Sequence, residues 1–111
     1  MIPITISAKD FKLTPALKSY VNDKLGRLAR LSPSIERIGV ELDVDRHHHQ
    51  GRNFRVEVWI YLPRRTIAAG LKAEDMRAAI DLVCPRLERR IVRYKDRLVS
   101  RRRRASRQMA G

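Results

Sequence analysis

The chain has only one cysteine and no long apolar segment, and each shortage excludes a class of protein. A single cysteine, Cys84, excludes an intramolecular disulfide and a thiolate metal cluster. No apolar run approaches the roughly 18 residues of a membrane-spanning helix, and the N-terminus lacks the pattern of a signal peptide. We therefore expect a cytoplasmic protein whose one thiol is reduced and packed in the core.

Acidic residues are scarce as well. Twelve Asp and Glu stand against 25 Lys and Arg, which gives a net charge of +13 in 111 residues. Such an excess repels itself unless a polyanion screens it, so nucleic acid is the first candidate partner and an anionic membrane surface the second. The length suffices for one domain with a single core.

Hydrophobic periodicity predicts an α+β fold. Alternation with a period of two predicts four strands, at about residues 2–8, 35–45, 54–63 and 66–72. Two amphipathic helices should cover one face of the resulting four-stranded sheet, so that the element order is β-α-β-β-β-α.

The helix boundaries follow from start and stop signals. Thr14 and Pro15 are typical of a helix start, and Ser32-Pro33 should end that helix near residue 31. The second helix is expected at about 74–99, with Glu74 and Asp75 in its first turn and a bend at Pro85. Residues 100–111 carry no apolar pattern, and we expect a basic flexible tail after a domain of residues 1–99.

A helical wheel at about 100° per residue separates the charges of both helices from their core stripes. The core stripe of the second helix consists of Ile80, Val83, Leu87, Ile91, Tyr94 and Leu98, and its arginine flank consists of Arg86, Arg89, Arg90, Arg93 and Arg97. In the first helix, Lys24, Arg27 and Arg30 cluster in the same way. A helix that is basic only for solubility more often mixes its signs, so we predict that these flanks bind phosphate. Periodicity does not settle whether the two flanks adjoin.

The other features of the sequence have plainer interpretations. The open sheet face should carry four carboxylates, which phosphate would avoid: Glu41, Asp43, Asp45 and Glu57. Trp59 and Tyr61 share that face, where they either stack on bases or, more commonly, cover neighbouring strands. Three consecutive histidines, residues 47–49, cannot converge on one ion, so we expect a solvated hairpin tip there, with no metal and no cofactor. No nucleophile or phosphate-loop motif is present, which argues against an enzyme with a small-molecule substrate.

Three segments together resemble a known family. EDMRAAID (74–81), LERRIVRYKDRL (87–98) and the Lys24-Leu25 pair are similar to the ribosome hibernation-promoting factors, the sigma-54 modulation protein family that includes ribosome-associated inhibitor A. The resemblance covers about residues 1–98 and implies a fold similar to that of double-stranded RNA-binding domains. It also implies a bacterial protein that binds small-subunit rRNA in the tRNA and mRNA channel and inhibits translation by steric exclusion in stationary phase or stress. The matching basic positions are Lys24, Arg27, Arg30, Arg86, Arg89, Arg90, Arg93 and Lys95, to which the wheel adds Arg97.

Some features depart from that family. Residue 77 is arginine where an aromatic is common, and the chain ends too early for the C-terminal dimerisation domain of long members. Its tail is also shorter than the extension of the inhibitor-type members, so ribosome pairing stays open, and we expect a monomer away from the ribosome. Two alternatives remain: a general double-stranded RNA-binding module, and a protein-interaction regulator acting through Trp59 and Tyr61.

Overall fold

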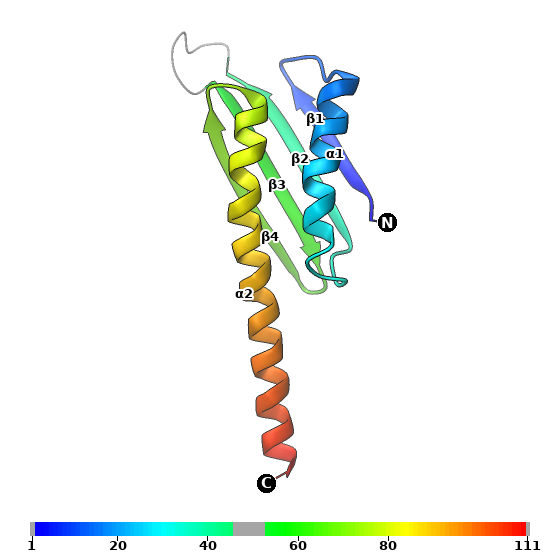
Figure 1. Ribbon diagram of the computed structural model, residues 1–111, viewed down its shortest axis with the longest axis vertical. Coiled ribbons are helices and arrows are strands. Elements are labelled where there is room, and N and C mark those ends of the chain that lie inside the picture. The colour runs from blue at the N-terminus through cyan, green and yellow to red at the C-terminus, as the bar shows by residue number, and fades with distance from the viewer. Residues whose placement is uncertain (1, 46–52, 111) are drawn as a thin grey trace.

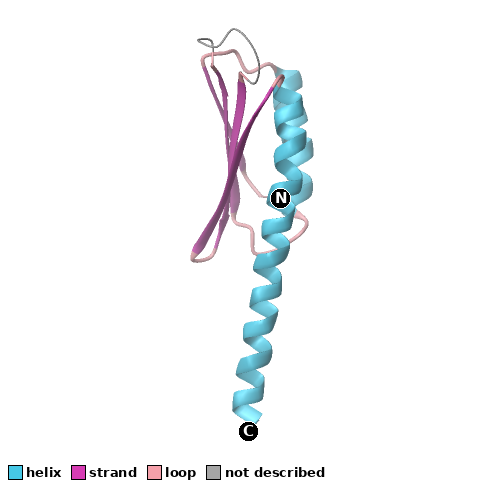
Figure 2. Cartoon of the chain, turned by 90° about the vertical axis from the view of Figure 1, so that its left-hand side faces the viewer, coloured by secondary structure: helices cyan, strands magenta, loops and turns pink. Residues whose placement is uncertain are grey.

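The computed structural model of the chain describes residues 2–45 and 53–110 and has the predicted order of elements. The elements are β1 (Ile4–Lys9), α1 (Pro15–Ala29), β2 (Arg37–Val44), β3 (Phe54–Leu62), β4 (Arg65–Ala73) and α2 (Met76–Ala110). The sheet order is β1-β2-β3-β4, in which β1 runs parallel to β2 and the other pairs are antiparallel. Both helices lie on one face of the sheet and leave the other face open (Figures 1 and 2). The prediction of a two-layer α+β fold is confirmed.

The core lies between the sheet and the two helices. Alternate residues of the central strands are buried, namely Ile38, Val40 and Leu42 in β2 and Val56, Val58 and Ile60 in β3. The helices contribute Val21, Leu25, Leu28, Ile80, Val83, Leu87 and Ile91. The parallel pairing of β1 and β2 follows from α1. This crossover helix returns the chain to the end of the sheet where β1 began, so β2 runs in the same direction as β1.

Side-chain caps fix where both helices begin. The Thr14 hydroxyl accepts a hydrogen bond from the backbone N–H of Leu17 at 3.2 Å, as its position before Pro15 predicts. The Asp75 carboxylate accepts from the N–H of Ala78 at 2.8 Å. The placement of Glu74 and Asp75 in the first turn of α2 is therefore wrong, because Asp75 precedes that turn and caps it. The first helix ends at Ala29, two residues before its predicted end at residue 31.

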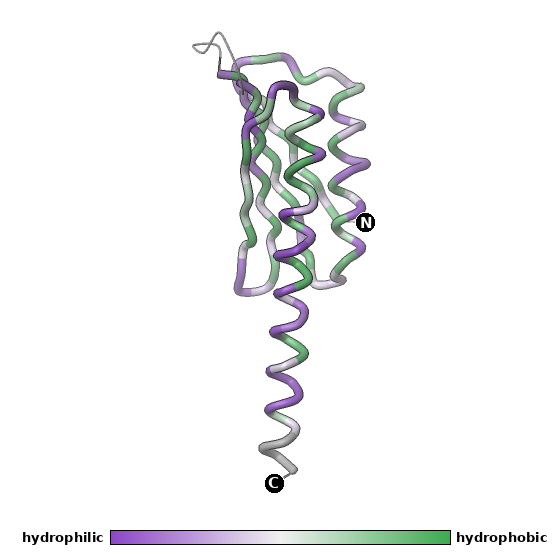
Figure 3. Tube along the Cα trace, turned by 60° about the vertical axis from the view of Figure 1, so that its left-hand side comes forward, coloured by the Kyte–Doolittle hydropathy of each residue, from purple (hydrophilic) through white to green (hydrophobic). Residues whose placement is uncertain are grey.

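The second helix does not end near residue 99, as the sequence predicted, but continues to Ala110. Pro85 lies inside α2 without ending it. The predicted end was wrong because hydrophobic periodicity detects a helix only where it packs on another element. The last turns of α2 extend beyond the sheet, and their described side chains have no such contact there. Arginine, alanine and glutamine nevertheless favour helix on their own. Figure 3 shows polar residues dominating the part of α2 beyond the sheet.

Two other predictions concern the β2–β3 connection and the thiol. The hairpin is confirmed by the antiparallel pairing of Val44 with Phe54, but the histidines 47–49 lie outside the described residues.

Cys84 packs at the margin of the core and is only half-buried. Burial raises the pKa of its thiol. In the described part of the chain, no helix is both long enough and apolar enough to cross a bilayer.

Candidate nucleic-acid interface

The arginine flank of α2 lies along β4, which is an edge strand of the sheet. The Arg90 guanidinium donates a hydrogen bond to the carbonyl oxygen of Ala68, and that of Arg86 donates to the carbonyl oxygen of Gly70 at 3.5 Å. Four residues of a helix rise about 6 Å, and two residues of a strand rise about 6.6 Å. Since the two spacings match, each turn of α2 brings an arginine to the next outward carbonyl of β4. The exposed strand edge is thereby covered by charge.

Further towards the C-terminus of α2, arginines from α2 and β4 surround one groove. Arg90, Arg93 and Arg97 of α2 line it together with Arg65, the first residue of β4, and its volume is about 200 Å³. We call these four residues the arginine groove. No carboxylate is among its lining residues, all of which belong to the described part of the chain. Guanidinium groups are planar multiple donors that suit phosphate oxygens, so the arginine groove is a candidate phosphate site.

A wider groove continues along α2 towards its N-terminus. It is lined by Lys72, Arg86 and Arg89, but also by Glu74 and Asp75, so it carries both signs of charge. Sequence reasoning missed Arg65 and Lys72 because it assigned Pro63-Arg64-Arg65 to a turn and treated the fourth strand only as part of the sheet. The signal that could have found them is the antiparallel run of β4 beside α2, which the short connection between the two elements already requires.

Of the three basic residues predicted on α1, only Lys24 points into the seam between the two helices. The Lys24 ammonium lies 3.6 Å from an Asp81 carboxylate oxygen, and the Tyr20 hydroxyl donates to that same carboxylate. The Arg77 guanidinium lies over the Tyr20 ring, 5.0 Å from its centroid. The seam therefore pairs Lys24 of α1 with Asp81 of α2, and this acid partly neutralises the charge of Lys24.

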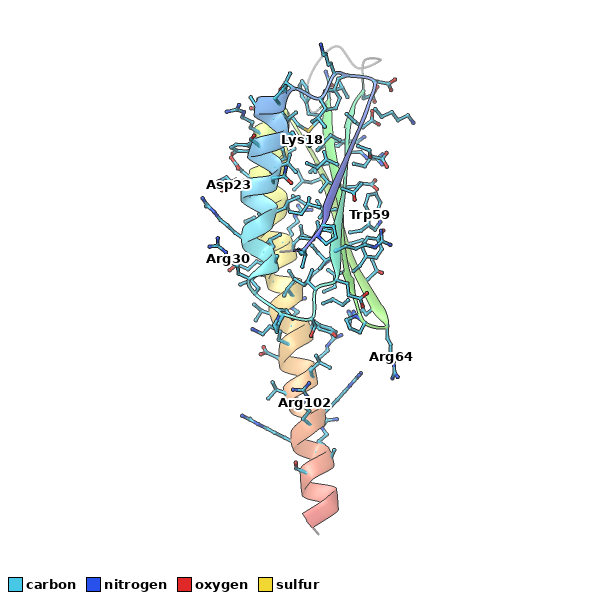
Figure 4. The ribbon with its side chains drawn as sticks, turned by 90° about the vertical axis from the view of Figure 1, so that its right-hand side faces the viewer. Lys18, Asp23, Arg30, Trp59, Arg64 and Arg102 are labelled. Carbon is cyan, nitrogen blue, oxygen red and sulfur yellow. The ribbon has the colours of Figure 1, made fainter. Side chains whose placement is uncertain are left out.

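The nine predicted residues thus fall into separate groups. Arg90, Arg93 and Arg97 lie in the arginine groove, and Arg86 and Arg89 line the wider groove beside it. Lys24 lies in the seam, and Arg27 pairs with Asp23 of its own helix at 3.3 Å. Arg30 and Lys95 are exposed outside these groups, and Figure 4 shows Arg30 at the end of α1. Because β4 and α1 flank α2 on opposite sides, the two basic flanks do not merge into one groove.

The seam makes a testable pH prediction. The hydrogen bond from Tyr20 to Asp81 raises the pKa of the phenol above its usual value, because the carboxylate stabilises the neutral hydroxyl and repels the phenolate. Replacing Asp81 by asparagine removes that negative charge. We expect the Tyr20 pKa to fall towards 10.0, the ordinary value for tyrosine, in a spectroscopic titration of a variant whose other tyrosines, Tyr61 and Tyr94, are phenylalanine.

The control for this titration is Glu88→Gln, which removes a carboxylate from the same helix two turns further on. It should leave the Tyr20 titration within about 0.3 units of the parent, since charge effects weaken quickly with distance in water. An unchanged Tyr20 pKa in Asp81→Asn would show that the contact between the helices does not form in solution.

The aromatic pair of the open sheet face has a packing role. Ring atoms of Tyr61 and Trp59 lie 3.5 and 3.7 Å from the position that a side-chain carbon on Gly39 would occupy. The Arg37 guanidinium stacks on the Tyr61 ring at 3.8 Å. The rings therefore cover the glycine of the neighbouring strand, which is the commoner of the two interpretations offered by the sequence.

A two-layer α+β domain with a carboxylate-free arginine groove beside its edge strand has the features of a polyanion-binding module. Comparison with known proteins gives the family: the chain belongs to the sigma 54 modulation protein / S30EA ribosomal protein family, which matches it over residues 4–99. That match spans all four strands, α1 and the part of α2 up to residue 99.

Curated relatives of this chain carry names that refer to the ribosome. The ribosome hibernation promoting factor of Azotobacter vinelandii is 29% identical over 98 residues, which are 88% of this chain and 87% of that protein. The ribosome hibernation promotion factor of Staphylococcus aureus (strain COL) is also 29% identical over 98 residues, but the match covers only 50% of that protein. The chain therefore spans about half the length of the second relative.

Solved structures support the same fold. A ribosomal subunit interface protein from Coxiella burnetii superimposes with a TM-score of 0.75 at 24% identity, covering 86% of this chain and 99% of that one. The Thermus thermophilus Protein Y N-terminal domain superimposes with a TM-score of 0.72 at 26% identity, covering 85% and 99%. The resemblance drawn from the three sequence segments is confirmed.

Proposed function

We propose that this chain is a ribosome hibernation factor. It binds rRNA of the small subunit in the tRNA and mRNA channel and inhibits translation by occupying that space in stationary phase or stress. The observation that carries the proposal is the arginine groove, a phosphate-compatible surface on a chain whose relatives are named for ribosome hibernation. The protein acts in the bacterial cytoplasm as a monomer and carries out no catalysis.

Binding in this proposal is mainly electrostatic. Arg65, Arg93 and Arg97 bind phosphates in the arginine groove, and Arg89 and Lys72 extend the contact along α2. The packed two-layer domain holds these residues in fixed positions. Arg86 and Arg90 contribute while they also cover the β4 edge. Lys24, Arg27, Arg30 and Lys95 complete the proposed RNA-binding set.

The proposal predicts a steep salt dependence. For six to ten phosphate contacts, affinity for small subunits should fall by roughly a thousandfold to a hundred-thousandfold between about 50 and 200 mM salt. Equilibrium binding of labelled protein at several salt concentrations measures this slope. A flat dependence would rule out a phosphate-dominated interface.

Sedimentation with bacterial ribosomes on a sucrose gradient, in moderate salt and with excess unrelated duplex RNA, tests the partner. We expect co-migration with the small subunit or the whole ribosome despite the competitor. Loss to the competitor would favour a general duplex-binding module instead. Trp59→Ala serves as the control for the open sheet face and should sediment like the parent, since Trp59 lies on the face opposite both helices (Figure 4).

A further inference from the structure

The last turns of α2 extend away from the rest of the molecule. Residues 99–110, which we call the helix extension, span about 18 Å at 1.5 Å per residue, and Figures 1 and 2 show no other element beside them. Every described side chain of the extension, from Val99 to Ser106, is exposed. It contributes to the length of the molecule, which measures 63 Å along one axis and only 28 and 19 Å along the others.

The charge of the helix extension opposes its own folding. It contains five arginines, at 101–104 and 107, and no acidic residue. Like charges three or four residues apart on a helix destabilise it by about 0.2–0.5 kcal/mol per pair, and Arg97, Arg101 and Arg104 form such a series. The side chains from Val99 to Ser106 are exposed, so packing on the sheet does not offset the repulsion there. An external anion that neutralised these charges would therefore stabilise the helix extension.

The distribution of the arginines indicates what kind of anion that is. Successive residues of a helix point about 100° apart, so Arg101–Arg104 project in four directions around the axis. Figure 4 shows side chains near Arg102 projecting from opposite sides of the helix. A helix that lies on a membrane surface needs an apolar face opposite its basic one. This extension has basic side chains on all sides, which suits a ligand that surrounds it.

We propose that the helix extension is a second RNA-binding element, separate from the arginine groove, which enters a groove or channel with phosphates on two sides. This inference rests on the proposed function for the identity of the RNA. Arg97, the last residue of the arginine groove, lies one helical turn before Arg101, so α2 holds both elements on one rigid axis. Docking of the body therefore aims the extension along a fixed direction.

The test uses two matched variants of the full chain, in which Arg101–Arg104 are all replaced either by glutamine or by lysine. Both residues favour helix, so only the charge differs between the variants. On small subunits, the glutamine variant should bind at least tenfold more weakly. Its slope of log affinity against log salt should be shallower by about two or more. Each lost phosphate contact lowers the magnitude of that slope by about 0.7–0.9. The lysine variant should keep the parent slope.

A second measurement separates this proposal from the proposed function. Binding to a labelled RNA duplex and to a single strand of the same length needs no ribosome, and the glutamine variant should lose more affinity for the duplex, which has phosphates on both sides of its grooves. Equal losses on the two RNAs, or a parent slope in the glutamine variant, would overturn the proposal even if the chain sediments with ribosomes. Unchanged RNA binding accompanied by lost binding to anionic lipid vesicles would overturn it in favour of a membrane.

Discussion

Replacement of Arg89 and Arg93 by glutamate should weaken binding to ribosomes by at least about a hundredfold and leave the fold intact. Like charges brought together across an interface cost several kcal/mol, and each 1.4 kcal/mol corresponds to about a factor of ten. Both side chains are exposed, and within the described part of the chain neither forms an ion pair. Equilibrium binding to small subunits measures the loss, and the urea midpoint measures the fold.

These two arginines are chosen because they do nothing for the sheet. Arg86 and Arg90 donate to carbonyls of β4, so replacing them would expose a strand edge and confuse binding with folding. The matched control reverses two exposed lysines elsewhere, Lys12 and Lys18, and thereby makes the same change in net charge. If both double variants lose affinity equally, the overall charge of +13 drives binding, and the two grooves beside α2, to which Arg93 and Arg89 belong, have no special role.

The sequence predicted the fold well because its local patterns agree with one another. Alternation in β2 and β3 gave the buried face correctly, as Val40, Val56 and Val58 show. The core stripe of α2 was also correct from Ile80 to Ile91. These patterns show which side of each element is apolar. In a two-layer fold, that side is the one buried against the other layer.

The arrangement of the basic residues could not be predicted in the same way. The wheel separated the arginine flank of α2 from its core stripe, but it carries no information on which element lies beside that flank. The structure places β4 there and directs Lys24 to Asp81 on the other flank. Arg65 joined the arginine groove for the same reason, since only the tertiary fold brings the start of β4 beside the last packed turns of α2.

The truncation Leu87→Ala should lower the free energy of unfolding by about 2 to 5 kcal/mol. Leu87 has no exposed surface and lies in the middle of the core stripe that holds α2 on the sheet. The whole domain is expected to be stable by only about 5–15 kcal/mol, so one residue accounts for a large fraction of the total. Urea denaturation followed by circular dichroism measures the change.

Leu82→Ala is the matched control, because it is the same chemical change on the same helix at a side chain that is 56% exposed. It should cost less than about 1 kcal/mol. Equal losses for the two leucines would mean that α2 is not seated on the sheet as described. The Leu87 variant should still bind ribosomes nearly as the parent does wherever a few kcal/mol of stability remain, since almost every molecule is then folded. The Leu87 variant would thus lose stability and keep affinity, whereas the Arg89 and Arg93 variant would lose affinity and keep stability. These opposite results would distinguish the face of α2 that packs on the sheet from the face that binds RNA.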